Sequence, residues 1–377
     1  MPATHDRALD ALLRRGRLRA LEPCRGMDFA SNDYLGLANS SALRHAVAAA
    51  IDRGVPVGSG GSRLLRGNHA EHEALEAEAA AFFGAETALF FGGGFIANTA
   101  IFSTLPGRGD LIVYDALIHA SAHEGMRLSK ADCVAAAHND AQAFADAITT
   151  WRGNGGTGTI WLAVESLYSM DGDRAPLDDL IAIADANDAV LVIDEAHATG
   201  VFGVGGRGLG AHLEGRANVI SLHTCGKALG VMGALVLAPS TLRDFLVNRA
   251  RAFIYATAPS PLIAAAVRAA LDIVQREPER RTTLHARIAF AAQTLQAQTR
   301  HAPSGSQIQP IIIGSDTRAV ALAAALRQRD FDIRAIRPPT VPEGTARLRL
   351  TITLNTSEDE LAAVIVALAD AEAELSP

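Results

Sequence analysis

The feature of this sequence that most constrains its fold is an alternation of short apolar runs with helix-like segments. Between most of the runs lie segments such as HAEHEALEAEAAAFFG, in which one face is predicted to carry Leu75, Ala79, Phe82 and Phe83, and Gly84 closes the end. Apolar strands that alternate with helices are typical of a mostly parallel sheet covered on both faces. We therefore predict an α/β domain with about seven strands, at residues 87–91, 111–114, 133–136, 159–165, 189–194, 219–223 and 234–238.

The pattern changes in the last third of the chain. A helical stretch is predicted from residue 261 to about residue 300, followed by strands at 308–314, 331–338 and 346–354 and helices at 318–329 and 358–375. The basic N-terminus is interrupted by Asp6, Asp10 and Glu22, which favours a solvated amphipathic helix over a targeting segment. We predict an N-terminal arm (1–40), a large α/β domain (41–289) and a small α+β domain (290–377).

Charge and cysteine content narrow the classes of function. A net charge of -7 argues against nucleic acid as the main ligand, because binding the phosphate backbone needs a basic face. No apolar stretch approaches the length of a membrane span. Cys24, Cys133 and Cys225 lie far apart without a CxxC pair, which argues against a thiolate zinc site and a disulfide framework. We expect a cytoplasmic protein.

Polar residues follow several of the predicted strands, where an open α/β sheet binds its ligands. The glycine turn before Gly94 and Phe95 leads into a helix N-terminus whose free N–H groups suit a phosphate. The other candidates that follow predicted strands are His119, Glu165, Ser169, Asp194, His197, Thr224 and Lys227. The sheet edge is thus predicted to combine a phosphate cradle, an acid, two imidazoles and a lysine.

Pyridoxal phosphate (PLP) needs that combination of groups. A lysine amine forms a Schiff base with the cofactor, and an acid keeps the pyridine nitrogen protonated so that the ring accepts electrons. Lys227 follows Asp194 by 33 residues (227 minus 194), which leaves room for one strand-helix-strand excursion. His119 would cover the face of the ring.

Other interpretations of these residues were weighed. Taken singly, Asp194 would be a helix cap and Lys227 a surface lysine. His119 and His123 stand four apart beside Glu124, but the order is not HExxH, so we predict no metal. Gly203–Gly208 fits the GxGxxG pattern of NAD-dependent oxidoreductases. It lies too far from its strand, however, and no acid occurs from 217 to 227, so we interpret it as a mobile glycine loop.

Five segments carry a resemblance to a known family: SNDYLGL, GSGGSRLLRGNHAEHEALE, ESLYSMDGD, DEAHATGVFG and TCGKALG. Together they resemble the α-oxoamine synthases, fold-type I PLP-dependent transferases, from about residue 31 to the C-terminus. The resemblance implies a homodimer that condenses an amino acid with an acyl thioester, here L-alanine with a pimeloyl thioester of CoA or acyl carrier protein. Glycine C-acetyltransferase and serine palmitoyltransferase types are alternatives. A non-catalytic scaffold subunit would be expected to lack the lysine.

The resemblance also implies a role for each matching residue. Lys227, Asp194 and His119 are the expected catalytic residues: Lys227 forms the Schiff base, Asp194 pairs with the pyridinium nitrogen and His119 stacks on the ring and meets substrate. His197 would reach the ring hydroxyl. The cofactor and its phosphate would be seated by Gly94, Phe95, Ser169, Thr224 and, from the partner subunit, a residue equivalent to Thr257. Arg349 would bind the amino-acid carboxylate near Asn32, and Arg19 and Thr340 would meet the acyl substrate.

Overall fold

The computed structural model describes residues 2–375, which form two compact units. The large unit comprises Leu35–Ser169 and Arg174–Arg281, and the small unit comprises residues 2–34, Met170–Asp173 and residues 282–375. The N-terminal residues thus group with the C-terminal ones, and the boundaries at 40 and 290 stay a prediction. No helix within residues 2–375 is both long and apolar enough to cross a membrane.

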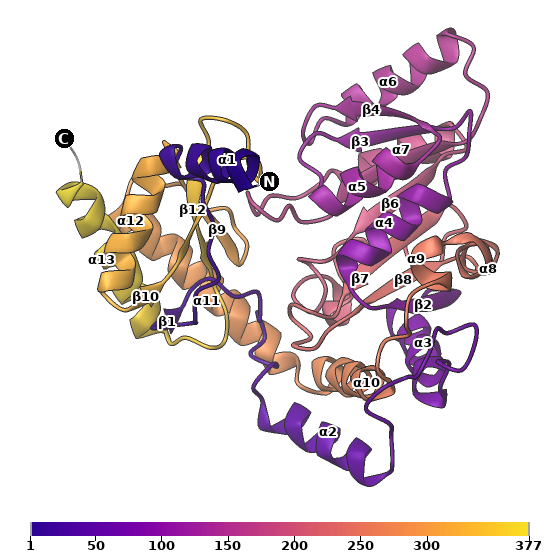
Figure 1. Cartoon of the computed structure of the whole chain (residues 1–377), viewed down its shortest axis with the longest axis horizontal. Coiled ribbons are helices and arrows are strands. Elements are labelled where there is room, and N and C mark those ends of the chain that lie inside the picture. Colours follow the sequence, from indigo (N-terminus) through magenta and orange to yellow (C-terminus); the bar gives the residue numbers. More distant parts are fainter. Residues whose placement is uncertain (1, 376–377) are drawn as a thin grey trace. The chain divides into compact units, whose positions relative to one another are not determined.

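The large unit is built on a seven-stranded sheet in the order β2-β8-β7-β6-β5-β3-β4 (Figure 1). Its neighbouring strands are parallel except that β8 is antiparallel to both β2 and β7. The mostly parallel α/β sheet predicted from the apolar runs is therefore confirmed. The strands are β2 (Thr87–Phe91), β3 (Leu111–Asp115), β4 (Asp132–Ala136), β5 (Ile160–Glu165), β6 (Val190–Asp194), β7 (Val219–Thr224) and β8 (Ala234–Ala238).

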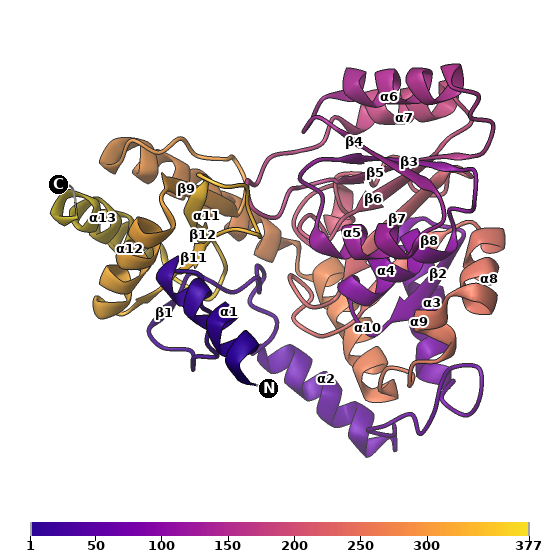
Figure 2. The same ribbon diagram turned by 45° about the horizontal axis from the view of Figure 1, so that its top comes forward.

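Helices cover both faces of this sheet, which explains why its strands are apolar throughout. One face packs against α4 (Gly94–Thr104), α5 (Ala120–Leu128), α8 (Ser240–Arg249) and α9 (Arg251–Ile254). The other face packs against α6 (Ala141–Gly153) and α7 (Leu177–Ala186), so that α6 and α7 lie across the sheet from α4 and α5 (Figure 2). Along β3, Ile112 belongs to the first core and Leu111 and Val113 to the second.

Three further helices pack together beside β2: α2 (Ser41–Asp52), α3 (Ala70–Phe83) and α10 (Pro261–Arg276). The single helical stretch expected from 261 to about 300 is in fact two helices, α10 and α11 (Pro278–Gln298). The break falls at Glu277, whose φ of -114° and ψ of 62° are not helical. Proline disfavours the helical conformation of the residue before it, so Pro278 ends one helix and starts the next.

The small unit contains an antiparallel sheet in the order β11-β12-β9. Its strands are β9 (Ile308–Gly314), β11 (Arg334–Ile336) and β12 (Ala346–Thr351), and its helices α12 (Asp316–Gln328) and α13 (Glu358–Glu374) match the predicted ones. Two short strands, β1 (Met27–Asp28) and β10 (Phe331–Asp332), pair in parallel, and α1 (Pro2–Arg14) forms the predicted N-terminal helix. The predicted smaller α+β part of the fold is confirmed.

Candidate active site

The ends of three adjacent strands place the predicted residues at one edge of the large sheet. β5, β6 and β7 are parallel neighbours, and Glu165 at the end of β5 pairs in register with Asp194 at the end of β6. Thr224 ends β7, three residues before Lys227. Because parallel strands end at the same edge, the acid and the lysine come from neighbouring positions on it.

Asp194 is held as a hydrogen-bond acceptor. Its Oδ1 accepts the backbone N–H of Ala196 at 2.9 Å, and its Oδ2 accepts Nδ2 of Asn98 at 2.7 Å. The side chain of Asp194 is buried, and each of its two oxygens accepts one of these hydrogen bonds. A fixed, buried carboxylate of this kind suits a cationic ring nitrogen.

Asn98 is a site residue that was missed in the sequence. It lies in α4 and is only 2% exposed. The signal was present, because Asn98 stands at a helix position flanked by buried alanines, and buried amides are nearly always hydrogen-bonded. Which partner it bonds depends on how α4 packs, and that could not be inferred from the pattern.

His119 caps the N-terminus of α5. Its Nδ1 accepts the backbone N–H of Ser121 at 3.2 Å and lies 2.7 Å from the Ser121 hydroxyl. His119 as a whole is exposed. Desolvation by the surrounding protein lowers the pKa of His119 and the nearby Lys227 charge lowers it further, although Asp194 acts in the opposite direction. His119 is therefore neutral at pH 7, and a neutral imidazole suits stacking on an aromatic ring.

The start of α4 provides a place for a phosphate. Its N-cap, Gly93, makes no side-chain capping hydrogen bond, so the first N–H groups of the helix remain available. A Cβ added to Gly94 would lie 3.5 Å from the Oγ1 of Thr224, which brings the glycine turn beside the end of β7. Phe95 is 53% exposed at the same helix start.

Glu165 is a second buried carboxyl group at this edge. It is 2% exposed, its Oε2 accepts the backbone N–H of Ser169 at 3.1 Å, and its Oε1 has no hydrogen-bond partner. Burial raises the pKa of Glu165 to about 8, Asp194 raises it as well, and the Lys227 charge opposes both. Ser169 is thus anchored to the end of β5 by an acid that is mostly protonated at pH 7.

The remaining large-unit residues are placed as follows. His197 is buried three residues beyond Asp194. Thr257 is exposed between α9 and α10, next to Ala258, whose N–H bonds the carbonyl of Gly61 at 2.9 Å. The reach of Thr257 to a partner's phosphate stays a prediction.

Taken together, these residues fit PLP. They supply an amine, a carboxylate held as an acceptor, a neutral imidazole and a helix N-terminus without a side-chain cap. The ring of His123 packs edge-on against Tyr114, with 5.2 Å between the ring centroids. Within residues 2–375 no three His, Cys, Asp or Glu side chains are grouped closely enough to hold a metal ion.

The glycine run that imitates a dinucleotide fingerprint serves an internal acid. The backbone N–H groups of Leu209 and Gly210 bond the buried carboxylate of Glu195 at 3.1 and 2.5 Å. A Cβ on Gly208 would lie 2.5 Å from that carboxylate, so glycine permits the close approach. The loop is anchored at Glu195, and these amides are not free to bind a phosphate.

In the small unit, Arg349 is fixed through one nitrogen and has another nitrogen without a hydrogen-bond partner. It lies in β12, is 8% exposed, and its Nη2 donates to Asn32 Oδ1 at 2.8 Å and to the Tyr34 hydroxyl at 3.3 Å. Its Nε has no hydrogen-bond partner although it is buried. Arg347, two residues earlier on the same face of the strand, is instead ion-paired with Asp171. The predicted pair Arg349 and Asn32 is thus brought together, and Tyr34 was missed.

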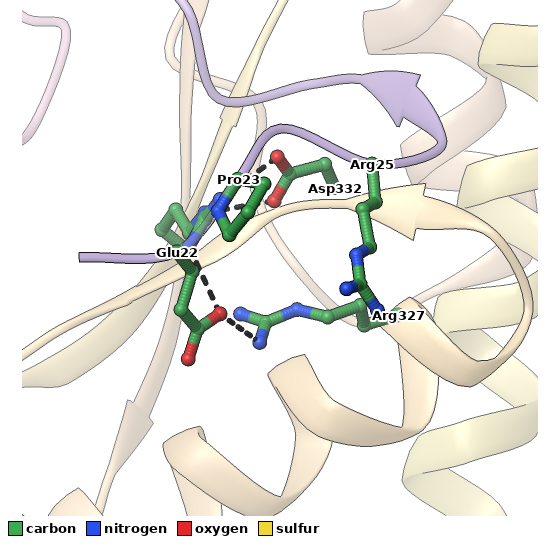
Figure 3. A pocket seen from close by; sticks show the side chains of 6 residues that line it. Glu22, Pro23, Arg25, Arg327 and Asp332 are labelled. Carbon is green, nitrogen blue, oxygen red and sulfur yellow. Dashed lines mark hydrogen bonds and ion pairs between the residues drawn. The ribbon is translucent and has the colours of Figure 1, made fainter. Parts of the chain in front are cut away.

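Two other predicted residues also meet in the small unit. Arg19 Nη2 lies 3.5 Å from the Oγ1 of Thr340, and both side chains are exposed. A separate pocket of the small unit is lined by Glu22, Pro23, Arg25, Arg327, Asp332 and Arg334 (Figure 3). Its two acids are ion-paired, Glu22 with Arg327 at 2.5 Å and Asp332 with Arg334 at 2.7 Å. None of the predicted site residues lines this pocket.

Known proteins share this fold and much of this sequence. The aminotransferase class I and II family model matches residues 25–368. A curated 8-amino-7-oxononanoate synthase of Chromobacterium violaceum is 42% identical over 339 residues, 90% of this chain and 87% of that protein.

Two solved structures extend the likeness to the fold. The 8-amino-7-oxononanoate synthase of Francisella tularensis (28% identity, TM-score 0.76) covers 92% of this chain and 97% of its own. The Sphingomonas wittichii serine palmitoyltransferase (26% identity, TM-score 0.86) covers 99% and 97%. The chain therefore belongs to the aminotransferase class I and II family of PLP-dependent enzymes, in the acyltransferase group whose curated members are 8-amino-7-oxononanoate synthases.

Proposed function

We propose that this enzyme joins L-alanine to a pimeloyl thioester and makes 8-amino-7-oxononanoate for biotin biosynthesis. A bond forms between Cα of alanine and the thioester carbonyl, the C–S bond breaks to free the thiol, and the carboxylate leaves as CO2. The observation that carries the proposal is Lys227 on the same sheet edge as Asp194, whose carboxylate is fixed as an acceptor.

The large-unit residues would handle the proton at Cα. When bound, PLP supplies an electron sink for the pair left when that proton is removed. Asp194 would hold the positive charge of the ring nitrogen, and the α4 N-terminus with Thr224 would hold the phosphate. The amine of Lys227 would take the proton from Cα and later return one. Neutral His119 would cover the ring and help to exclude water.

The small-unit residues would bind the charged ends of the substrates. Arg349 already donates through Nη2 to Asn32, and its partnerless Nε can donate to a carboxylate oxygen. Arg19 and Thr340 would contact the acyl chain or its carrier. The sequence of residues 335–351, AIRPPTVPEGTARLRLT, supports the pimeloyl-using branch because it resembles that branch most.

One assay tests the proposal. The full chain, loaded with PLP, is supplied with alanine and pimeloyl-CoA or pimeloyl acyl carrier protein, and thiol release and product mass are followed. We expect turnover with alanine and a pimeloyl thioester that exceeds the turnover of glycine with acetyl-CoA or of serine with palmitoyl-CoA. A preference for either of the latter pairs would assign the chain to another branch of the family.

A second measurement separates an enzyme from a scaffold subunit of the same fold. The loaded protein should be yellow and should lose its Schiff-base absorbance after borohydride treatment. A protein that stays colourless after PLP is added would contradict catalysis altogether, whichever substrates are offered.

A further inference from the structure

A continuous line of hydrogen bonds connects the buried Asp194 to His119. Asn98 Nδ2 donates to Asp194 Oδ2 at 2.7 Å and to Ser121 Oγ at 2.9 Å, and Ser121 Oγ lies 2.7 Å from His119 Nδ1. Asn98 and Ser121 are 2% and 0% exposed, so water does not compete for the two bonds that Asn98 donates. The line runs from β6 through α4 to the first turn of α5.

The line exists because α4 and α5 lie unusually close together. A Cβ at Gly125 would be 2.8 Å from Cβ of Phe102 and 3.0 Å from the carbonyl oxygen of Asn98. Only glycine permits this approach, and Ser121 stands one helical turn before Gly125 on the same side of α5. The contact thus places the Ser121 hydroxyl within reach of Asn98.

Counting donors fixes the direction of each bond. The amide of Asn98 must present its nitrogen to Asp194, because two oxygens would repel, and its second hydrogen points at Ser121 Oγ. The Ser121 oxygen therefore accepts, and its only hydrogen goes to His119 Nδ1. Nδ1 also accepts the Ser121 backbone N–H. Two donors on Nδ1 require a lone pair there, so the imidazole hydrogen must be on Nε2.

We propose that Asn98 and Ser121 are positioning residues that hold His119 as its neutral Nε2–H tautomer and tie it to Asp194. One hydrogen-bond network then fixes both Asp194, which would hold the ring nitrogen, and His119, which would cover the ring. The relay thus leaves Nε2, the ring nitrogen not bonded to Ser121, as an N–H donor and not an acceptor. The relevance to catalysis rests on the function proposed above, but the tautomer itself does not.

The tautomer can be measured without substrate. The full chain loaded with PLP is labelled with 15N-histidine, and the ring nitrogens of His119 are identified among the 12 histidines by comparison with His119→Gln. NMR distinguishes a protonated from an unprotonated ring nitrogen. We expect a single Nε2–H tautomer in the wild type. An Nδ1–H tautomer there would overturn the proposal.

Variants then test the relay. Ser121→Ala removes one donor to Nδ1, and Asn98→Leu frees the Ser121 hydroxyl to turn and accept from Nδ1–H. Both should raise the Nδ1–H tautomer to a measurable share, whereas Ser121→Thr keeps the hydroxyl and the wild-type tautomer. Ser129→Ala, at the other end of α5, is the matched control. Unchanged tautomers in Ser121→Ala would overturn the proposal even if Asn98→Leu fails to fold.

Kinetics give a second readout. Losing one hydrogen bond in the relay should lower kcat/KM for the amino acid by about 3- to 10-fold in Ser121→Ala, with Ser121→Thr near wild type. If the enzyme prefers other substrates than alanine and pimeloyl thioester, the proposed function fails while the tautomer result stands. The two failures are therefore distinguishable.

Discussion

The cofactor edge of the large unit and the arginine site of the small unit are organised differently. At the cofactor edge both oxygens of Asp194 accept hydrogen bonds, whereas Glu165 beside it accepts a bond through one oxygen only and is mostly protonated at pH 7. In the small unit, two arginines on one face of β12 differ, because Arg347 is ion-paired with Asp171 while Arg349 keeps a buried Nε without a partner. The first arrangement holds Asp194 as an acceptor, and the second leaves one arginine donor unused, which we predict binds a ligand.

The largest expected effect is the loss of turnover when Lys227 is removed from the cofactor edge. Lys227→Ala removes the amine that would hold PLP and move the Cα proton, so turnover should fall by about 1,000-fold or more. The Schiff-base absorbance should disappear, while the circular dichroism spectrum of the folded chain remains. Turnover close to wild type would refute the role of Lys227.

The next largest effect is expected from variants of the two arginines of β12, Arg349 and Arg347. Arg349→Lys loses the fork that can bond a carboxylate, and KM for the amino acid should rise by about 10- to 100-fold. Arg347→Met leaves Asp171 with no ion-pair partner and should instead lower the free energy of unfolding by about 1 kcal/mol, because Asp171 is partly solvated. Steady-state kinetics and urea unfolding of both variants check this contrast.

The same pair of variants can contradict the comparison. If Arg347→Met raises KM for alanine as much as Arg349→Lys does, the two arginines share one function. Arg349 would then not be the reserved donor that its partnerless Nε indicates.

Glu165 predicts a pH dependence of stability at the cofactor edge. Its pKa is raised from 4.5 to about 8 in the folded chain, so between these pH values the native state holds a proton that the unfolded chain has lost. The free energy of unfolding of the wild type should therefore fall as pH rises from 4.5 toward 8, relative to Glu165→Gln. Urea unfolding of both cofactor-free proteins across this range measures the difference, and parallel curves would contradict a protonated Glu165.

The smallest effect concerns Thr257. If a homodimer places this hydroxyl on the partner's phosphate, Thr257→Ala should weaken PLP binding by about 3- to 10-fold. PLP titration followed by absorbance measures the change, and Ser260→Ala, at the nearby N-cap of α10, serves as the control. An unchanged affinity in a protein that is dimeric by light scattering would remove Thr257 from the site.

Much of the large unit was predictable because each of its strands is encoded by a short stretch of sequence. Short apolar runs give buried parallel strands, and each strand end delivers the residues that follow it, so Asp194, Thr224 and Lys227 fall at one edge from chain order alone. The break between α10 and α11 was missed, because Pro278 overrides an otherwise helical pattern.

The amino-acid sequence by itself determined that an acid, Asp194, and then a lysine, Lys227, follow two successive buried strands. This order, with the motifs around it, indicated the family and its cofactor. Only the tertiary structure decided the bonding partners. Asn98 reaches Asp194 and Ser121 because Gly125 lets α4 and α5 approach, and Arg349 meets Asn32 across 317 positions of the chain. Periodicity encodes which face of an element is buried, whereas the partner of a buried polar group depends on long-range packing, which no local pattern records.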